Sequence, residues 1–413
     1  MNHHADILVL GAGQAGAQLA ISLRQGGHTG SILLAGDEPD LPYERPPLSK
    51  EYLVGERDAA SLALRPAAFW EQRSVTLRLG DRAVAVDPGA HRVRFASGTA
   101  VTYGHLVWAA GGRPRPLPLP GADCAGVHAL RTRADVDRLR AALADGTQVA
   151  IIGAGYIGLE VAPALLKLGK PVVVLESQER VLARVTCPEV SAFYAAEHRA
   201  RGVDLRTGVR LERVLSTAGH VSGLRFADGT PDLACNLLVA AIGIEPSVEL
   251  LQAAGADCSN GVEVDSFCHT SLPDIYAIGD CANHVNRYAA GARVRLESVP
   301  NAVEQAKVVA AALLGRPVPY AALPWFWSNQ FDIKLQTVGL NHGYDDVVLR
   351  GTPAARSFSA VYLREGRVVA LDCINAPRDF AQGKALVERG LAPPRTLLAD
   401  DQVPLKTLAD APA

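Results

Sequence analysis

Gly11-Ala-Gly-Gln-Ala-Gly16 and Gly153-Ala-Gly-Tyr-Ile-Gly158 are the two stretches that decide the fold of this chain. Each follows a short apolar run, Asp6–Leu10 or Gln148–Ile152, and each opens a segment with the apolar spacing of a helix. In a strand–turn–helix unit, such glycines let backbone amides approach a pyrophosphate at the helix N-terminus. A single glycine pattern can recur by chance, but two in the same context predict two dinucleotides held by one protein.

The two glycine motifs belong to longer repeats. An apolar strand and the acids Asp37 and Glu38 follow the first motif, and an apolar strand and Glu176 follow the second. Each repeat then shows a hairpin signal, RFASGT at 94–99 and RFADGT at 225–230, and ends in an apolar strand followed by glycine and proline. This shared order predicts a duplicated dinucleotide-binding domain, that is, an α/β protein with two Rossmann-like domains.

The composition argues against several classes of protein. Apolar residues make up 48% and charged residues 20%, and the formal net charge of −2 gives no sign of nucleic-acid or anionic-membrane binding. No apolar run approaches the roughly 18 residues that a membrane-spanning helix needs. The first predicted strand begins by Ile7, which leaves no room for a signal peptide. We therefore expect a cytoplasmic protein that binds neither nucleic acid nor membrane.

Seven cysteines are scattered along the chain, and no two of them form a CxxC pair. This pattern favours reduced thiols that pack as small apolar residues, and it predicts no metal site. Flavin reductases that act on disulfides need a redox-active cysteine pair, and the sequence offers none.

The length of 413 residues predicts two or three domains. A proline-rich stretch at 113–120 marks one boundary. The last segment has alternating strands at Ser357–Leu363 and Arg367–Leu371, then helices at Asp379–Glu388 and Leu397–Leu408. The predicted division is 1-113 with 247-323 for the first dinucleotide-binding domain, 114-246 for the second, and 324-413 for a small C-terminal α+β domain.

Six segments, taken in order, resemble one family. They are GAGQAG at 11–16, YERPPLSK at 43–50, GAGYIGLE at 153–160, TSLPDIYAIGD at 270–280, ESVPN at 297–301 and PWFWSNQ at 324–330. Together they are similar to the FAD-dependent NADH:ferredoxin reductases of bacterial cytochrome P450 and ring-hydroxylating oxygenase systems. The resemblance covers essentially the whole chain. It implies a glutathione-reductase-like fold, tightly but non-covalently bound FAD, and NADH as co-substrate.

The resemblance also implies a mechanism and partners. NADH would give a hydride to the flavin, which would pass single electrons to a [2Fe-2S] ferredoxin in a transient electrostatic complex. The ferredoxin would feed a P450 or a Rieske oxygenase. Because ferredoxins are usually acidic, the candidate docking residues are basic, although each could equally be an ordinary solvated charge: Lys307, Lys334, Arg378 and Lys384.

The first glycine motif is predicted to hold the FAD pyrophosphate, with Asp37 or Glu38 on the adenosine ribose. By resemblance, Lys50 lies beside the isoalloxazine ring and Asp280 accepts a hydrogen bond from the ribityl chain. Arg131 matches a family arginine at this site, but an ordinary surface arginine fits the sequence nearly as well. The full predicted FAD set is Gly11, Gly13, Gln14, Ala15, Gly16, Asp37, Glu38, Arg45, Pro46, Lys50, Ala83, Ala110, Gly111, Arg131, Gly279, Asp280, Glu297, Ser298, Val299 and Trp327.

The second motif is predicted to hold the nicotinamide coenzyme. Glu176 at the strand end would accept the ribose hydroxyls and repel a 2′-phosphate, which favours NADH, although Arg184 could tolerate that phosphate. Glu160, expected in the first turn of the helix, would by resemblance face the nicotinamide and pair with Lys50 as the catalytic pair. A carboxylate that only complements the helix dipole is the alternative. The full predicted NAD set is Gly153, Gly155, Tyr156, Ile157, Gly158, Glu160, Glu176, Arg184, Gly243 and Ile244.

Two matters stay open on the sequence. Trp325 and Trp327 share one face of a predicted strand, where they could border an electron exit or simply pack in a core. The acceptor could also be rubredoxin or monodehydroascorbate. A protein similar to apoptosis-inducing factor, acting as a binding module, would be expected to carry targeting or basic nucleic-acid-binding segments, and these are absent from the sequence.

Overall fold

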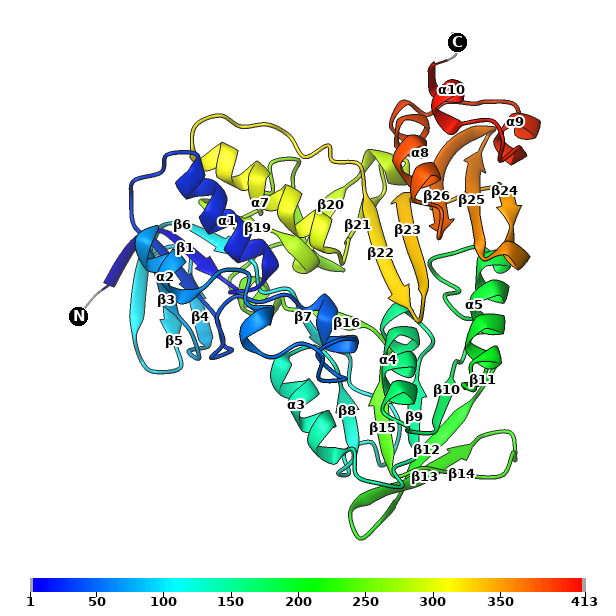
Figure 1. Ribbon diagram of the computed structural model, residues 1–413. Coiled ribbons are helices and arrows are strands. Elements are labelled where there is room, and N and C mark those ends of the chain that lie inside the picture. Colours follow the sequence, from blue (N-terminus) through cyan, green and yellow to red (C-terminus); the bar gives the residue numbers. More distant parts are fainter. Residues whose placement is uncertain (1–2, 411–413) are drawn as a thin grey trace. The chain divides into compact units, whose positions relative to one another are not determined.

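The computed structural model describes residues 3–410 (Figure 1). Its contacts divide the chain into two compact units. Unit 1 contains the chain up to Glu44, Leu62–Arg113 and Glu245–Phe326, and unit 2 contains Arg45–Ser61, Pro114–Ile244 and the chain from Trp327 onward. This division groups residues 45–61 with the second glycine motif, whereas the sequence-based division places them with the first. The three-domain division stays a prediction.

Unit 1 is built on a mixed sheet. Its strands are β1 (His3–Leu10), β2 (Ile32–Ala35), β3 (Val75–Arg78), β4 (Ala83–Asp87), β5 (Arg92–Phe95), β6 (Ala100–Trp108) and β19 (Ile275–Ala277). Strands β3, β2, β1, β6 and β19 are parallel neighbours in that order, and β5 and β4 continue from β6 as an antiparallel hairpin. The parallel part has the strand order of a Rossmann domain.

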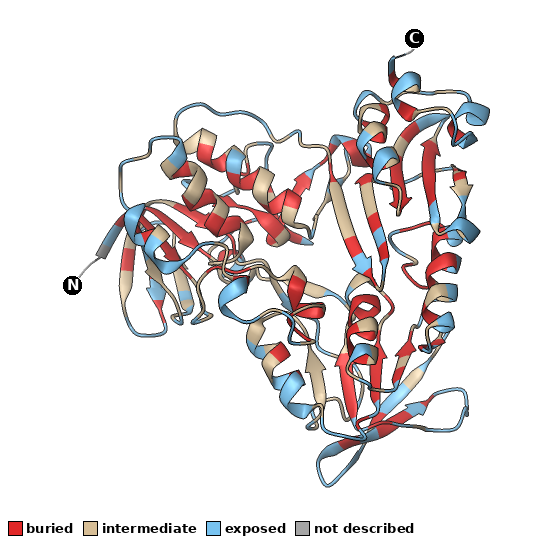
Figure 2. Ribbon diagram, in the orientation of Figure 1, coloured by how far each residue is buried: buried red, intermediate tan, exposed pale blue. Residues whose placement is uncertain are grey.

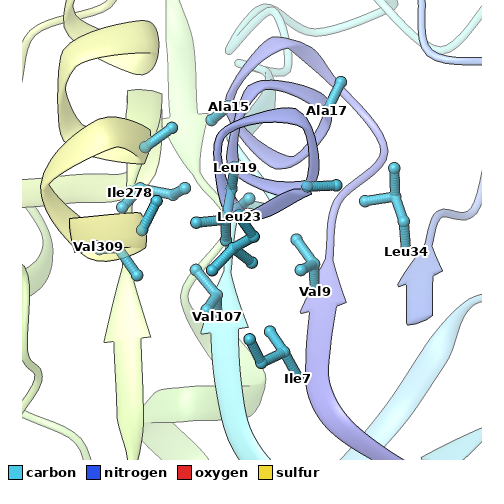
Figure 3. Close-up of a cluster of buried hydrophobic side chains, with 14 of the residues drawn as sticks. Ile7, Val9, Ala15, Ala17, Leu19, Leu23, Leu34, Val107, Ile278 and Val309 are labelled. Atoms are coloured by element: carbon cyan, nitrogen blue, oxygen red, sulfur yellow. The ribbon is translucent and has the colours of Figure 1, made fainter. Parts of the chain in front are cut away.

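Two helices cover one face of this sheet, α1 (Gln14–Gln25) and α7 (Val299–Leu313). Leu19 and Leu23, four residues apart on α1, share a helix face and are fully buried against Val9 and Val107 of the sheet (Figure 3). Burying each such side chain stabilises the fold by about 1.5–3 kcal/mol. Helix α7 begins two residues before the predicted Asn301, because Ser298 accepts a hydrogen bond from the Asn301 amide and caps it.

The other face of the sheet has its own buried cluster, which includes Leu106, Val262 and Ile275. The remaining elements of unit 1 are short: α2 (Ala67–Gln72), α6 (Glu249–Ala253), β17 (Cys258–Ser259), β18 (Gly261–Val264), η3 (Gly279–Cys281), β20 (Ala282–Val285), η4 (Arg287–Ala289) and β21 (Arg293–Val294). The short η2 (Ala60–Leu62) lies where the chain passes from unit 2 back into unit 1. The strand predicted over Thr270–Asp280 is limited to β19. It ends early because Gly279 turns the chain with a φ of +78° into η3.

Unit 2 repeats the same strand order. Its parallel sheet runs β11 (Asp204–Arg206), β10 (Val172–Leu175), β9 (Val149–Ile152), β15 (Leu237–Ala240) and β8 (Val127–Ala129). Figure 2 shows β9 and β15 largely buried, as expected for central strands covered on both faces. Around it lie η1 (Pro46–Ser49), α3 (Arg133–Ala142), α4 (Tyr156–Lys167), α5 (Pro188–Ala200) and the separate sheet β12 (Leu211–Thr217), β13 (His220–Phe226) and β14 (Leu233–Ala234).

The two parallel sheets confirm the predicted α/β class with two Rossmann-like domains. One expected strand is divided: the apolar run Leu237–Ile244 forms β15 and then, beyond Gly243, β16 (Ile244–Pro246). Gly243 has a φ of +94°, which ends the extended backbone between the two strands. Strand β7 (Gly112–Pro114) and β16 lie where the chain passes from one unit to the other.

The C-terminal segment forms a five-stranded sheet with helices. The sheet order is β22 (Trp325–Gln330), β23 (Ile333–Gly339), β26 (Arg367–Ile374), β25 (Ser357–Arg364) and β24 (Asp346–Thr352), with η5 (Pro353–Ala355) before β25. The predicted hairpin with a Glu-Gly turn is confirmed, since β25 and β26 pair across Glu365 and Gly366. Helix α8 (Pro377–Arg389) contains the predicted Asp379–Glu388.

The last predicted helix, Leu397–Leu408, is wrong as a single element. The chain instead forms two short helices, α9 (Arg395–Ala399) and α10 (Leu405–Asp410). Arg350, only 3% exposed, donates to the carbonyl oxygens of Leu398 and Val403, at 3.4 and 2.7 Å, and also to that of Asp400. These carbonyls are therefore unavailable to a continuous helix, and Pro404 has no amide hydrogen to extend one.

A buried carboxylate joins the C-terminal sheet to the segment before α5. Asp372 on β26 accepts hydrogen bonds from the Tyr362 and Thr186 hydroxyls, both at 2.5 Å. Burial raises the pKa of Asp372 to about 6, and the two hydrogen bonds only partly oppose that rise.

Asp372→Asn should therefore change how stability depends on pH. The raised pKa stabilises the folded protein fully below about pH 4, and this contribution is lost as the pH rises to about 6. The free energy of unfolding of the variant minus that of the wild type should thus rise by roughly 2–3 kcal/mol between pH 4 and pH 7. Urea unfolding across this range measures it, and a difference that does not vary with pH would contradict the assignment.

No helix among residues 3–410 is both long and apolar enough to cross a membrane.

Candidate functional site

In unit 1, predicted FAD residues follow three adjacent parallel strands. Leu10 of β1 pairs in register with Trp108 of β6, which in turn pairs with Ala277 of β19. The chain therefore continues from one edge of the sheet into Gly11, into Ala110 and Gly111, and into Gly279 and Asp280. The carboxyl edge of an open parallel sheet is where such folds bind ligands.

The three glycines of the first motif have different surroundings. Gly11 has a φ of +117°, and an added Cβ would lie under 3.0 Å from the Ala109 carbonyl oxygen. A Cβ on Gly16 would collide with the carbonyl oxygen of Gly11, so this glycine lets α1 approach the turn. A Cβ on Gly13 would meet nothing within 4 Å. The open side of Gly13, at the N-terminus of α1, is where a pyrophosphate can reach backbone amides.

Unit 2 repeats this geometry residue by residue. Gly153 has a φ of +104°, and a Cβ there would lie 2.5 Å from the Ala241 carbonyl oxygen. A Cβ on Gly158 would collide with the Gly153 carbonyl oxygen, whereas one on Gly155 would meet nothing within 4 Å. Gly243 also faces open space. The residues of both turns therefore fit a dinucleotide, with Gly13 and Gly155 as the two points of approach.

The acids that follow the second strand of each unit are not equivalent. Glu176 comes directly after β10, and its carboxylate accepts the amides of Ala154 at 2.7 Å and Gln178 at 2.8 Å. In unit 1 the residue directly after β2 is Gly36, and Asp37 and Glu38 come later. A Cβ on Gly36 would lie 2.8 Å from that of Ala12, so the turn is too close there for a larger residue.

Asp37 and Glu38 also differ from each other. Glu38 is half-buried and accepts a hydrogen bond from the Tyr43 hydroxyl at 2.6 Å, while Asp37 is exposed. Arg184, in the loop before α5, is exposed as well. Ile157 in the first turn of α4 is 45% exposed, an unusual position for a large apolar residue. The side chain of Tyr156 is directed inward, since burial raises the pKa of its hydroxyl well above the usual value.

The predicted FAD residues near α7 are linked to the Gly279–Asp280 turn. Gln305, which is fully buried on α7, accepts the Gly279 amide at 2.7 Å. Arg295 donates to the Asp280 carbonyl oxygen at 2.9 Å and pairs with Glu297 at 2.6 Å. Glu297, Ser298 and Val299 lead into the N-terminus of α7, and Ala83 begins β4.

The predicted catalytic pair, Lys50 and Glu160, is in contact within unit 2. The Lys50 ammonium donates to the Glu160 carboxylate and, at 3.1 Å, to the Pro46 carbonyl oxygen. Glu160 is 5% exposed and also accepts the Ser49 and Ser328 hydroxyls, each at 2.7 Å. It is the fifth residue of α4, so the expectation that it lies in the first turn is wrong. Its partners are side-chain donors, and the helix-dipole alternative does not account for them.

Two more predicted FAD residues, Arg45 and Arg131, are joined by a hydrogen bond. Arg45 precedes η1 and donates to the Arg131 carbonyl oxygen at 2.5 Å, and Arg131 precedes α3.

Trp325 and Trp327 are both on β22, as the alternation predicted, and both are half-buried. Whether these tryptophans border an electron exit or pack in a core stays a hypothesis.

Sequence reasoning missed the polar residues that hold these features. Ser49 and Ser328 lie inside the segments YERPPLSK and PWFWSNQ, but neither serine was predicted to have a role. The alternation of side chains along a strand could have indicated Ser328, because Ser328 and Gln330 share the strand face opposite the tryptophans. Gln305 and Arg295 carry no sequence signal of this kind.

None of the seven thiols is activated. Five cysteines are buried, and burial raises the pKa of Cys235 and Cys281 to about 12. The pKa values of Cys124 and Cys258, which are partly exposed, are raised as well. A thiolate is the reactive form of cysteine, so these groups are poorly suited to disulfide exchange.

Comparisons with known proteins cover the whole chain. A family model described as pyridine nucleotide-disulphide oxidoreductase matches residues 5–306, and one described as reductase C-terminal matches residues 325–409. A relative from Sphingobium sp., the 5,5'-dehydrodivanillate O-demethylase ferredoxin reductase subunit, is 51% identical over 99% of this chain and 99% of its own.

Two solved structures are similar over their full lengths. The ferredoxin reductase for the CYP199A2 system from Rhodopseudomonas palustris is 42% identical with a TM-score of 0.94, covering 98% of this chain and 100% of that one. The covalent putidaredoxin reductase–putidaredoxin complex gives 40% identity and a TM-score of 0.95, covering 100% of both. These matches confirm the resemblance that the six sequence segments carry.

Proposed function

The chain belongs to the pyridine nucleotide-disulphide oxidoreductase family and has a reductase C-terminal domain, and we propose that it is the NADH-dependent reductase of a [2Fe-2S] ferredoxin. FAD and a nicotinamide dinucleotide are the cofactors of this class, as the sequence predicts. When bound, FAD supplies the chemistry that turns a two-electron hydride into single electrons. The ferredoxin would in turn feed a cytochrome P450 or a ring-hydroxylating oxygenase.

The observation that carries the proposal is the pair of open glycines. Gly13 and Gly155 each stand at a helix N-terminus with free space where a pyrophosphate would lie. We assign the first to FAD, with Asp280 and Ser298 among its contacts. We assign the second to NADH, with Glu176 on the ribose.

Lys50 and Glu160 have different roles in this proposal. The ammonium of Lys50 would stabilise negative charge on the reduced ring of FAD. Glu160 holds Lys50 in place through their ion pair. Neither residue needs to act as a nucleophile.

The relatives support the choice of acceptor. Their names link them to ferredoxin and putidaredoxin, and this chain spans nearly their whole length. Reduced thiols and a need for NADH fit the cytoplasm, where we place the enzyme.

We further propose that Lys334 on β23 and Arg378 on α8, both exposed, contribute to the ferredoxin-docking surface. Reversing both charges should slow ferredoxin reduction about tenfold at low salt, while NADH-to-ferricyanide turnover stays unchanged. Lys307 serves as the comparator, because Glu304 pairs with it at 2.7 Å and already offsets its charge. Lys384 lies against the Phe380 ring, 4.5 Å from its centre, and is less available. Unchanged cytochrome c reduction through the ferredoxin would rule these two residues out.

The function itself is tested by pairing the enzyme with ferredoxins encoded beside it and following NADH-driven cytochrome c reduction. Ferredoxin-dependent reduction supports the proposal. Faster transfer to rubredoxin or monodehydroascorbate would reassign the acceptor. Slow NADH oxidation with a long-lived charge-transfer complex and no competent acceptor would contradict an electron-transfer role.

A further inference from the structure

A continuous chain of buried side-chain hydrogen bonds leads from Glu160 into α5. Ser328 donates to Glu160 Oε1 at 2.7 Å, and Gln330 Nε2 lies 3.3 Å from the Ser328 hydroxyl. Gln330 Oε1 lies 2.9 Å from His198 Nε2. Ser328, Gln330 and His198 are each at most 1% exposed. Every member of this chain belongs to unit 2.

The direction of each hydrogen bond in this chain is fixed. The Gln330 amide hydrogen occupies the Ser328 oxygen, so the single Ser328 proton points to Glu160. Gln330 then offers its oxygen to His198, whose Nε2 must carry the hydrogen. Each donor therefore directs its positive end toward the Glu160 carboxylate, where Lys50 and Ser49 add two more from the other side.

His198 ends the chain as a neutral ring. Burial lowers the pKa of His198 to about 4, and its Nδ1 has no hydrogen-bond partner among the described residues. A neutral imidazole with hydrogen on Nε2 satisfies Gln330 and places no second positive charge near Lys50. The chain thus stabilises one charge only, that of Glu160.

The alternation of side chains along β22 explains why Ser328 and Gln330, and not the tryptophans, reach Glu160 and His198. Ser328 and Gln330 alternate with the exposed Asn329 and point to the opposite face of the strand. Through them the strand contacts α4 at Glu160 and α5 at His198. A strand needs only apolar residues to pack, so two buried polar residues aimed at one carboxylate require another reason.

We infer that Ser328 and Gln330 are positioning residues, which hold the Glu160 carboxylate oriented toward Lys50. This inference rests on the proposed function, because it takes Lys50 and Glu160 as the pair that serves the flavin. Through it, the reductase C-terminal segment sets the electrostatics of a carboxylate located in the nucleotide-binding segment.

Few other titratable groups face Glu160. Tyr156 on α4 and Tyr194 on α5 are near it, and burial raises the pKa of both hydroxyls far enough to keep them neutral. Lys50 is therefore the charged group that faces the carboxylate, with neutral His198 beyond Gln330. A displacement of the Glu160 carboxylate should consequently be visible at Lys50.

The experiment uses lysine-labelled ¹³C NMR of the FAD-loaded protein. The chain has seven lysines, and Lys50→Arg assigns the Lys50 signal. At a fixed neutral pH, the chemical shift of that signal reports where the Glu160 carboxylate lies relative to the Lys50 ammonium. In Ser328→Ala the signal should move away from its wild-type position, since one hydrogen bond that orients the carboxylate is lost. Gln330→Leu should give a smaller shift in the same direction.

Two matched variants separate positioning from general disturbance. Ser328→Thr keeps the hydroxyl and should restore the wild-type chemical shift, and Asn329→Ala changes the exposed neighbour and should leave it unmoved. Ser328→Ala should also lower kcat for NADH-to-ferricyanide transfer more than it raises KM. An unshifted Lys50 signal in Ser328→Ala, in protein with normal thermal stability and flavin content, would overturn the inference. So would an equal shift in Asn329→Ala.

The two proposals can fail separately. If the wild-type enzyme reduces no ferredoxin, the proposed function fails, yet the Lys50 signals of the variants still decide what Ser328 does. If ferredoxin reduction is intact and the Lys50 signals of wild type and Ser328→Ala coincide, only the positioning role is wrong.

Discussion

Gly155→Val should abolish tight NADH binding while the protein keeps its fold and its FAD. A Cβ at this position would meet nothing within 4 Å, so we expect the chain to fold with a side chain there. The valine would occupy the space through which a pyrophosphate reaches the amides at the start of α4. Losing two charge-assisted hydrogen bonds raises KM for NADH by at least about 100-fold. Steady-state kinetics and the flavin absorbance of the purified variant measure both effects.

The matched change in the other unit should give the opposite result. Gly13→Val has the same open surroundings, so this variant should fold but be purified without FAD. Gly158→Val is the steric control, because its Cβ would collide with the Gly153 carbonyl oxygen and destabilise the protein whatever the ligand. The assignment of the two glycine turns would be contradicted if Gly155→Val lost its flavin and Gly13→Val kept it.

Glu176→Ala should change the choice of coenzyme. The carboxylate accepts two amides of its own loop, Ala154 and Gln178, and retains lone pairs for ribose hydroxyls. Removing it should raise KM for NADH about 10- to 100-fold. Because repulsion of a 2′-phosphate disappears as well, the ratio of kcat/KM for NADH over NADPH should fall roughly 100-fold.

A second variant at this position separates charge from loop geometry. Glu176→Gln keeps an oxygen for the Ala154 amide but carries no charge, so it should lose the discrimination against NADPH while losing less NADH affinity. If both variants keep the wild-type preference for NADH, the selectivity lies elsewhere. Exposed Arg184 would then be the next residue to change.

Sequence patterns predicted the parts of this protein that backbone geometry dictates. A GxGxxG turn has one set of steric requirements, and Gly11 and Gly153 meet them with φ values of +117° and +104°. The parallel arrangement of each sheet likewise follows from alternating strands and helices. Contacts between side chains distant in sequence are harder to predict. The pairing of Lys50 with Glu160 came from resemblance, and strand alternation places Ser328 on the face opposite the tryptophans without indicating that it contacts Glu160.

The predicted boundaries of helices and strands were wrong where a residue distant in sequence determines them. Apolar spacing alone gave one helix over Leu397–Leu408, because the pattern does not reveal that buried Arg350 binds the carbonyl oxygens at the break. Pro404 was the local sequence signal for this break in the helix. Strand β19 ended early for a different reason, since the turn at Gly279 depends on a positive φ that the sequence only permits.

The central claim is that electrons pass from NADH to a one-electron acceptor without a thiol. Stoichiometric reduction under anaerobic conditions tests it most directly: one NADH is added to the FAD-loaded enzyme with excess ferredoxin, before and after alkylation of accessible cysteines. We expect two ferredoxins reduced per NADH in both cases, because five of the seven cysteines are buried and the thiols of Cys124, Cys235, Cys258 and Cys281 have raised pKa values. Loss of ferredoxin reduction after alkylation, or NADH oxidation with no ferredoxin reduced, would contradict the account.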